Sequence, residues 1–183
     1  MMSQFNLPDV INVYFVESPA GACGYYSPSR DAIAMGKNCI GLGDRTWSHE
    51  MGHYLTLPHT FLGWECYEEI SSIPDPAPED ISELNFPSCF WAGLEVEKVD
   101  GSNCEDAADG FCDTAPDYLM ERWSCNGSGI YPDSLTDPNG QKFIVSGANI
   151  MSYANDGCVE GFSEEQKGAM LTDLDDRIGL VDN

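Results

Sequence analysis

Residues 49–59 read HEMGHYLTLPH, and they hold all three histidines of the 183-residue chain. Histidines that serve core packing or general surface polarity are spread along a sequence, so their confinement to one stretch indicates a shared role. Imidazole is a common metal ligand, and three imidazoles this close together are enough for one metal site. The stretch therefore predicts a metal centre.

His49 and His53 are four residues apart, which places them on one face of an α-helix that we expect at about residues 45–57. Two imidazoles so placed can bind one ion at about 2.0–2.1 Å, the usual zinc–nitrogen distance. Glu50 lies too far around the helix to bind the same ion. Its carboxylate can instead reach a water molecule on that ion and act as a general base.

Pro58 predicts that the helix ends nearby, because its ring clashes with the preceding turn. The chain can then bring His59 to the ion as a third ligand, which leaves one position open for water. Three protein ligands and an open position are typical of catalytic zinc sites, whereas structural sites usually use four protein ligands. Two other interpretations stay open: a chance HExxH on an ordinary helix, and a distant glutamate as third ligand.

The stretch 49–59 resembles the metzincin signature HExxHxxGxxH, with its three histidines and its glutamate at matching positions. Thr56 stands where that signature has glycine, so we expect either a different turn or a strained one. Residues 149–153, NIMSY, resemble the metzincin Met-turn. The resemblance implies that Met151 underlies the zinc site and that Tyr153 approaches the metal or stabilises an oxyanion.

A narrower resemblance is to the pappalysin family, including its cytophagalysin-like bacterial members. It covers about residues 9–175 and is carried by HEMGHYLTLPHTF, GFCDTAPDY, NIMSY and GFSEEQ in that order. The family consists of secreted zinc endopeptidases that are often stabilised by calcium. The resemblance implies an α+β, metzincin-like zincin fold, in which a small mixed β-sheet and the active-site helix form an upper part. An irregular, disulfide-rich lower part with a C-terminal helix would follow.

The expected organisation is one catalytic domain over residues 1–183, with an upper part at about 1–59 and a lower part at about 60–183. Val10–Val16 and Ala32–Ile40 are expected to be strands, the second at the sheet edge above the cleft. Family members carry strands and a long helix before the first of these, so we expect an N-terminally truncated upper part.

Four prolines interrupt the acidic stretch 65–109, which predicts irregular structure there. Apolar residues argue against a flexible linker in this stretch: Ile81, Leu84, Phe86, Phe90, Trp91 and Leu94. Further on, Ser163-x-x-Gln166 is a capping-box pattern. Apolar residues at helical spacing follow it and predict the C-terminal helix: Met170, Leu171, Leu174 and Ile178.

The chain is strongly acidic, with 31 Asp and Glu against 8 Lys and Arg and a formal net charge of −23. Nucleic acids and anionic membrane surfaces are therefore excluded as favourable partners. An acidic, solvated surface accounts for the charge, and bound calcium ions offer a second explanation. The candidate calcium ligands are Glu105, Asp106, Asp109 and Asp113.

Eight cysteines in a small acidic chain favour disulfides and an oxidising compartment, although a cytosolic chain with free thiols stays open. None of them has CxxC spacing, which argues against a thiolate zinc site. The pappalysin resemblance implies a disulfide between Cys125 and Cys158. We expect a secreted protein, although the start of the sequence carries no signal-peptide pattern and Val10–Val16 is too short to span a membrane.

These observations predict a monomeric zinc-dependent endopeptidase that acts on polypeptides, with Glu50 as general base and Tyr153 beside the oxyanion. The negative charge predicts a preference for basic residues, with Asp156 near the S1′ pocket. The alternative is an inactive binding module stabilised by zinc and calcium, although such a module has no use for Glu50. A metal-storage role is disfavoured, because one site is too few.

Overall fold

The computed structural model describes residues 2–8, 10–66, 70–80, 94–132 and 135–177. The chain forms two compact units, one made of residues 1–57 and 166–183 and the other of residues 58–165. The C-terminal helix therefore belongs to the first unit, whereas the sequence placed all of 60–183 in the lower part. Among the described helices, none has the length and apolar character that a membrane-spanning helix needs.

A three-stranded mixed sheet organises the first unit. Its strands are β1 (Asn12–Val16), β2 (Gly24–Ser27) and β3 (Ala32–Gly36), in the order β1-β3-β2. β3 is parallel to β1 and antiparallel to β2. The expectation of an edge strand at Ala32–Ile40 is wrong, because β3 is the central strand of the described sheet and ends at Gly36. Every residue of β3 is buried, as a short apolar run in the middle of a sheet should be.

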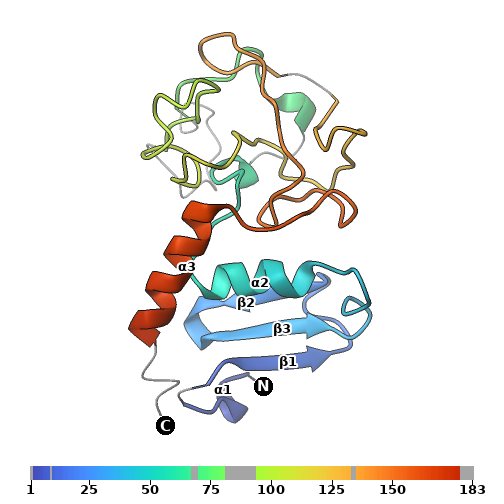
Figure 1. Cartoon of the computed structure of the whole chain (residues 1–183). Coiled ribbons are helices and arrows are strands. Elements are labelled where there is room, and N and C mark those ends of the chain that lie inside the picture. The colour runs from blue at the N-terminus through green and yellow to red at the C-terminus, as the bar shows by residue number, and fades with distance from the viewer. Residues whose placement is uncertain (1, 9, 67–69, 81–93, 133–134, 178–183) are drawn as a thin grey trace. The chain divides into compact units, whose positions relative to one another are not determined.

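The helix α2 (Thr46–Tyr54) contains the first two histidines and covers one side of the sheet, where it contacts β2 and β3 (Figure 1). Its first turn is stabilised by the Asp44 carboxylate, which accepts a hydrogen bond from the Thr46 N–H at 2.8 Å. The helix ends earlier than expected, in a turn at Thr56 rather than at Pro58. The N–H groups of Thr56 and Leu57 bond to carbonyls of the last helical turn, which is a Schellman motif.

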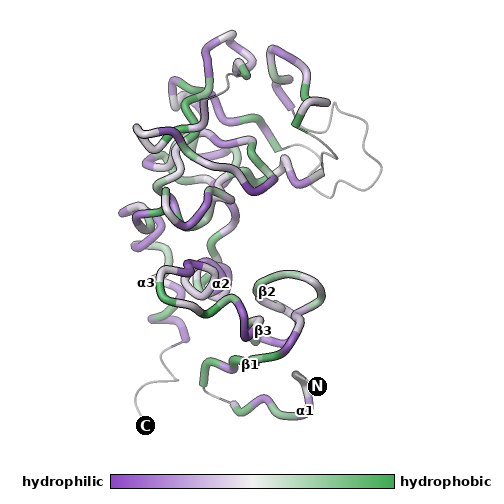
Figure 2. The backbone as a smooth tube through the Cα atoms, turned by 90° about the vertical axis from the view of Figure 1, so that its right-hand side faces the viewer, coloured by the Kyte–Doolittle hydropathy of each residue, from purple (hydrophilic) through white to green (hydrophobic). Residues whose placement is uncertain are grey.

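The core of the first unit lies between the sheet and two helices. Its buried members are Ile33, Met35, Tyr54 and Leu55. The C-terminal helix α3 (Glu164–Arg177) adds Met170 and Leu174 to this cluster, and Figures 1 and 2 both draw α3 beside α2. Leu171 is exposed instead, and Ile178 lies outside the described residues. A short helix α1 (Met2–Phe5) precedes the sheet.

Among the described residues, the other regular elements are short 3-10 helices: η1 (Pro28–Arg30) in the first unit, and η2 (Trp64–Cys66) and η3 (Ile70–Ser72) in the second. The described part of the second unit otherwise has isolated β-bridges and a core of large side chains, which include Phe61, Trp64, Tyr118, Leu119 and Met151. The irregular structure expected in 65–109 is confirmed for its described residues. Ile81, Leu84, Phe86, Phe90 and Trp91 lie outside them.

Disulfides join Cys23 to Cys39 in the first unit, and Cys104 to Cys112 and Cys125 to Cys158 in the second. Cys125 thus has the partner that the pappalysin resemblance implied. The predicted fold class is confirmed: the chain is α+β, with a small mixed sheet under the histidine-bearing helix, an irregular disulfide-containing part and a C-terminal helix.

Candidate metal centre

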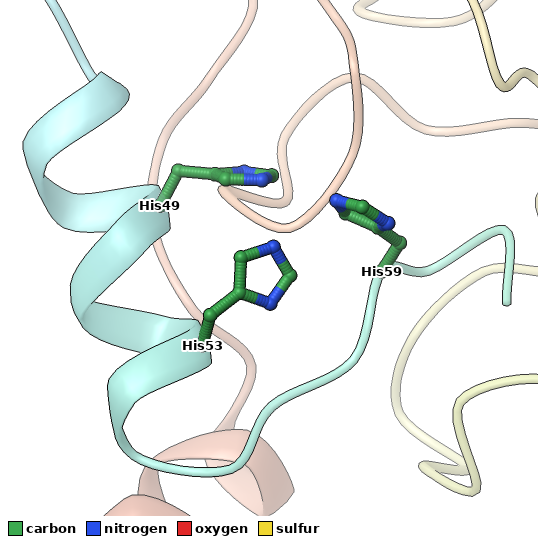
Figure 3. A group of neighbouring side chains, drawn as sticks. All are labelled: His49, His53 and His59. Atoms are coloured by element: carbon green, nitrogen blue, oxygen red, sulfur yellow. The ribbon is translucent and has the colours of Figure 1, made fainter. Parts of the chain in front are cut away.

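The three histidines converge on one point (Figure 3). His49 and His53 project from the same face of α2, and His59 approaches from the segment that follows the helix. One ring nitrogen from each lies within 4.8 Å of the other two, and each residue is half-buried. The Schellman motif explains the position of His59, because it anchors Leu57 to the last turn of α2 only two residues earlier.

Two of the imidazoles are held in the tautomer that metal binding requires. His53 Nδ1 lies 2.8 Å from the Leu57 carbonyl, and His59 Nδ1 lies 3.1 Å from Oε1 of Glu65. Both oxygens are acceptors, so each Nδ1 carries the proton and donates, and Nε2 is the nitrogen with a lone pair for a metal. The other oxygen of Glu65 accepts the Gly63 N–H at 2.7 Å, which fixes the carboxylate. Nothing in the sequence pattern had singled out Glu65.

Three imidazoles fit a borderline metal ion such as zinc, and in the HExxH context zinc is the ion that the donor set suits best. Glu50, next to the first ligand, is only 6% exposed. Burial raises the pKa of its carboxyl to about 7, although a hydrogen bond from the Tyr26 backbone N–H lowers it in part. A carboxyl group whose pKa lies near neutrality is suited to accept and return a proton.

The Met-turn residues lie next to the chain segment that carries His59. The Thr60 N–H donates to the Met151 carbonyl at 3.3 Å, and the Met151 side chain is fully buried. The Tyr153 ring packs edge-on against the His59 imidazole, with 4.9 Å between the ring centroids. Tyr153 is therefore a direct neighbour of one of the three imidazoles.

Thr56 adopts a left-handed backbone conformation with φ of 71°. The sequence left open whether this turn is built differently from the metzincin turn or is strained. The strained turn is observed, because Thr56 takes the conformation in which glycine is favoured. A β-branched side chain in this region is a steric outlier, and such strain costs on the order of 1–3 kcal/mol. The Thr56 hydroxyl donates to the Leu55 carbonyl at 2.7 Å.

The four candidate calcium ligands occupy different environments. Glu105 and Asp106 are exposed. The Asp113 carboxylate accepts the Glu165 N–H at 2.9 Å and thereby caps the start of α3. In return, the Glu165 carboxylate accepts the Cys112 N–H at 2.6 Å. Asp109 alone is buried, at 8% exposure. Among the described residues, no set of carboxylates converges as tightly as the three histidines do.

Asp109 belongs to a different group of acidic residues, which the sequence did not predict. Glu97 and Asp117 are buried as well, at 4% and 3% exposure. Burial, together with the charges of Asp109 and Asp117, raises the pKa of Glu97 to about 8. Burial also raises the pKa of Asp117 to about 7 and that of Asp109 to about 6. Oε2 of Glu97 and Oδ2 of Asp109 are buried without a hydrogen-bond partner.

Asp156, the expected S1′ residue, lies 3.9 Å from Arg122. It does not line the cavity of about 200 Å³ that the second unit contains. That cavity begins at Thr60, runs along Asn149 of the Met-turn, and includes the acidic residues Asp113 and Glu160. The acidic residues of this cavity are therefore Asp113 and Glu160, and the role of Asp156 in an S1′ pocket stays a prediction.

Comparisons with known proteins give little beyond the fold. No protein-family model and no curated protein matches the chain. Among solved structures, the chain is similar to mature mirolysin from Tannerella forsythia, determined in complex with a cleaved peptide, at 19% sequence identity and a TM-score of 0.49. The match covers 87% of this chain and 50% of mirolysin, so the chain spans about half of that protein. A match with so low a sequence identity and TM-score supports no conclusion about function.

Proposed function

We propose that this chain is the catalytic domain of a zinc-dependent endopeptidase of metzincin type that resembles the pappalysin family. The observation that carries the proposal is the convergence of the three imidazoles beside a buried glutamate. A site that only held a metal for stability would need neither an open coordination position nor a carboxyl group with a pKa near neutrality.

His49, His53 and His59 would hold the zinc ion. A zinc ion bound there would polarise the scissile carbonyl and acidify a water molecule, as in other catalytic zinc sites. Glu50 takes the proton of the attacking water and returns it to the leaving amine. Tyr153, which packs against His59, would donate a hydrogen bond from its hydroxyl to the developing oxyanion.

The substrate in this proposal is an extended polypeptide. β2 is the edge of the described sheet next to α2, so its outer main-chain groups, apart from the Tyr26 N–H that donates to Glu50, can pair with a peptide strand. Within the second unit, the acidic cavity beside the Met-turn would take a substrate side chain, and Glu160 favours a basic one. This assignment replaces Asp156 with Glu160 as the residue that determines specificity.

We also propose a structural calcium site at Glu97 and Asp109, with Asp117 nearby. Support comes from the two buried carboxylate oxygens that lack a partner, because buried charged groups are normally paired or bound to a metal. Oxygen ligands from carboxylates and main-chain carbonyls are those that calcium prefers. The disulfides and the calcium site both suit a secreted protein.

The test of the main proposal is cleavage of casein by the zinc-loaded chain, with and without a chelator. We expect cleavage that the chelator abolishes and that zinc restores. Glu50→Gln should retain one zinc ion per chain and lose at least about 100-fold in rate, because it cannot accept the proton. Full activity of this variant would refute the mechanism, and a zinc-loaded wild-type chain that cleaves nothing would favour the inactive binding module.

A further inference from the structure

Gly24, the first residue of β2, lies against the general base. A Cβ atom at this position would lie 2.9 Å from Cγ of Glu50, 2.9 Å from Sδ of Met35 and 3.0 Å from Cγ2 of Thr46. The two distances of 2.9 Å are shorter than real Cβ contacts and the third is tighter than most of them, so any side chain here must displace a neighbour. The φ of Gly24 is not in the left-handed region, unlike that of several other glycines. Space, rather than backbone conformation, therefore requires glycine at this position.

Two residues further on, β2 supplies a hydrogen bond to the same side chain. The Gly36 N–H donates to the Cys23 carbonyl at 2.7 Å, which identifies this pair as a hydrogen-bonded pair of the antiparallel ladder. Hydrogen-bonded pairs alternate along such a ladder, so Gly24 and Tyr26 direct their main-chain N–H and C=O groups away from β3. The Tyr26 N–H on this open edge is the donor to the Glu50 carboxylate.

We propose that β2 positions the general base: Gly24 leaves the space in which Glu50 Cγ lies, and the Tyr26 N–H holds the carboxylate at its end. The inference rests on the proposed function, in which Glu50 is the base. A side chain at position 24 would push Cγ away and carry the carboxylate off the Tyr26 N–H. Gly24 is thus a positioning residue, because it acts on the reaction only through Glu50.

The first test compares Gly24→Ala with Gly41→Ala, a control in the same unit whose added Cβ would meet nothing within 4 Å. The measurements are kcat and KM on a peptide substrate, together with the zinc content. A displacement of about 1 Å in a reacting group can cost roughly 100-fold in rate. We expect Gly24→Ala to lower kcat by about 10- to 100-fold with zinc content unchanged.

KM should change little, because the substitution leaves the main-chain groups on the edge of β2 in place. The control should behave like wild type. An unchanged kcat in Gly24→Ala, or a rise in KM alone, would overturn the proposal.

The second test does not depend on activity. Denaturant unfolding of the full chain is measured for Gly24→Ala alone and in two backgrounds, Glu50→Ala, which removes Cγ, and Glu50→Gln, which keeps it. Residues in contact show non-additive effects in such cycles. In the wild-type background, Gly24→Ala should lower the unfolding midpoint by a measurable amount. We expect about half of this loss in the Glu50→Ala background and the full loss in the Glu50→Gln background.

Equal losses in all three backgrounds would show that the strain falls on Met35 or Thr46, and would overturn the proposal. If the wild-type chain cleaves no peptide, the proposed function fails, and the unfolding cycle still decides whether Gly24 positions Glu50. If wild type is active and the losses are equal, the further inference fails alone.

Discussion

The Glu65 carboxylate lies 3.1 Å from Nδ1 of His59 and holds that imidazole with Nε2 as the metal-binding nitrogen. Removal of such a partner typically weakens metal binding by about 10- to 100-fold. We therefore expect Glu65→Ala to raise the zinc dissociation constant by this factor, measured by competition with a chromogenic chelator. Glu65→Gln, which keeps an acceptor oxygen, should lose less. Zinc affinity unaffected by Glu65→Ala would show that His59 needs no such support.

Glu160 is expected to set the side-chain preference at the cavity beside the Met-turn. Cleavage of a peptide library should show enrichment of Lys or Arg at one position for the wild type. Glu160→Gln should reduce kcat/KM on the preferred peptide by about tenfold, which corresponds to the loss of one hydrogen bond to a charged group. Asp156→Asn is the matched control, since it removes the same charge outside the cavity. A library profile without basic enrichment would remove the assignment altogether.

The cluster of three buried carboxyl groups, those of Glu97, Asp109 and Asp117, predicts that the stability of the chain depends on pH. The pKa values of these groups in the folded state are raised to about 8, 6 and 7. A carboxyl group whose pKa is higher in the folded state binds more protons there, so its ionisation favours unfolding. In the presence of a chelator, the unfolding midpoint should therefore fall as the pH rises from about 4 to 8.

Calcium at 100 times its dissociation constant should restore about 2.7 kcal/mol of stability at pH 8. Glu97→Gln should lose most of this calcium effect. Glu105→Gln should retain it, because Glu105 is exposed and lies outside the buried group. A calcium effect that disappears in Glu105→Gln but not in Glu97→Gln would favour the ligand set expected from the sequence.

Thr56→Gly is expected to stabilise the chain. The residue has φ of 71°, where glycine has no steric penalty and a β-branched residue does. Relief of this strain, less the entropy that glycine adds to the unfolded state, should give a gain of about 1 kcal/mol. Thr56→Ala keeps the Cβ atom and should give no gain. Denaturant unfolding of both variants measures the difference, and equal stabilities would mean that Thr56 is not strained.

The sequence by itself determined the metal centre. His49, His53 and His59 lie within one helix and the turn that follows it, and such short-range geometry depends on residue spacing alone. In the structure one ring nitrogen of each lies within 4.8 Å of the other two, as this spacing predicts. The α+β class was predictable for a similar reason, since hydrophobic periodicity and turn residues indicate elements locally.

Tertiary structure decided what surrounds the three histidines. β3 is central and β2 is the edge because of strand pairing, which a short apolar run does not specify. Glu97 and Asp117 are 20 residues apart in the sequence and become neighbours only when the irregular unit folds, so no local pattern indicates their shared burial. Gly24 has a role only because packing of α2 on β2 brings Glu50 against it. The spacing of the candidate metal ligands is fixed by the sequence. The hydrogen-bond partners of side chains, their burial and the close contact between Gly24 and Glu50 depend on how the chain packs.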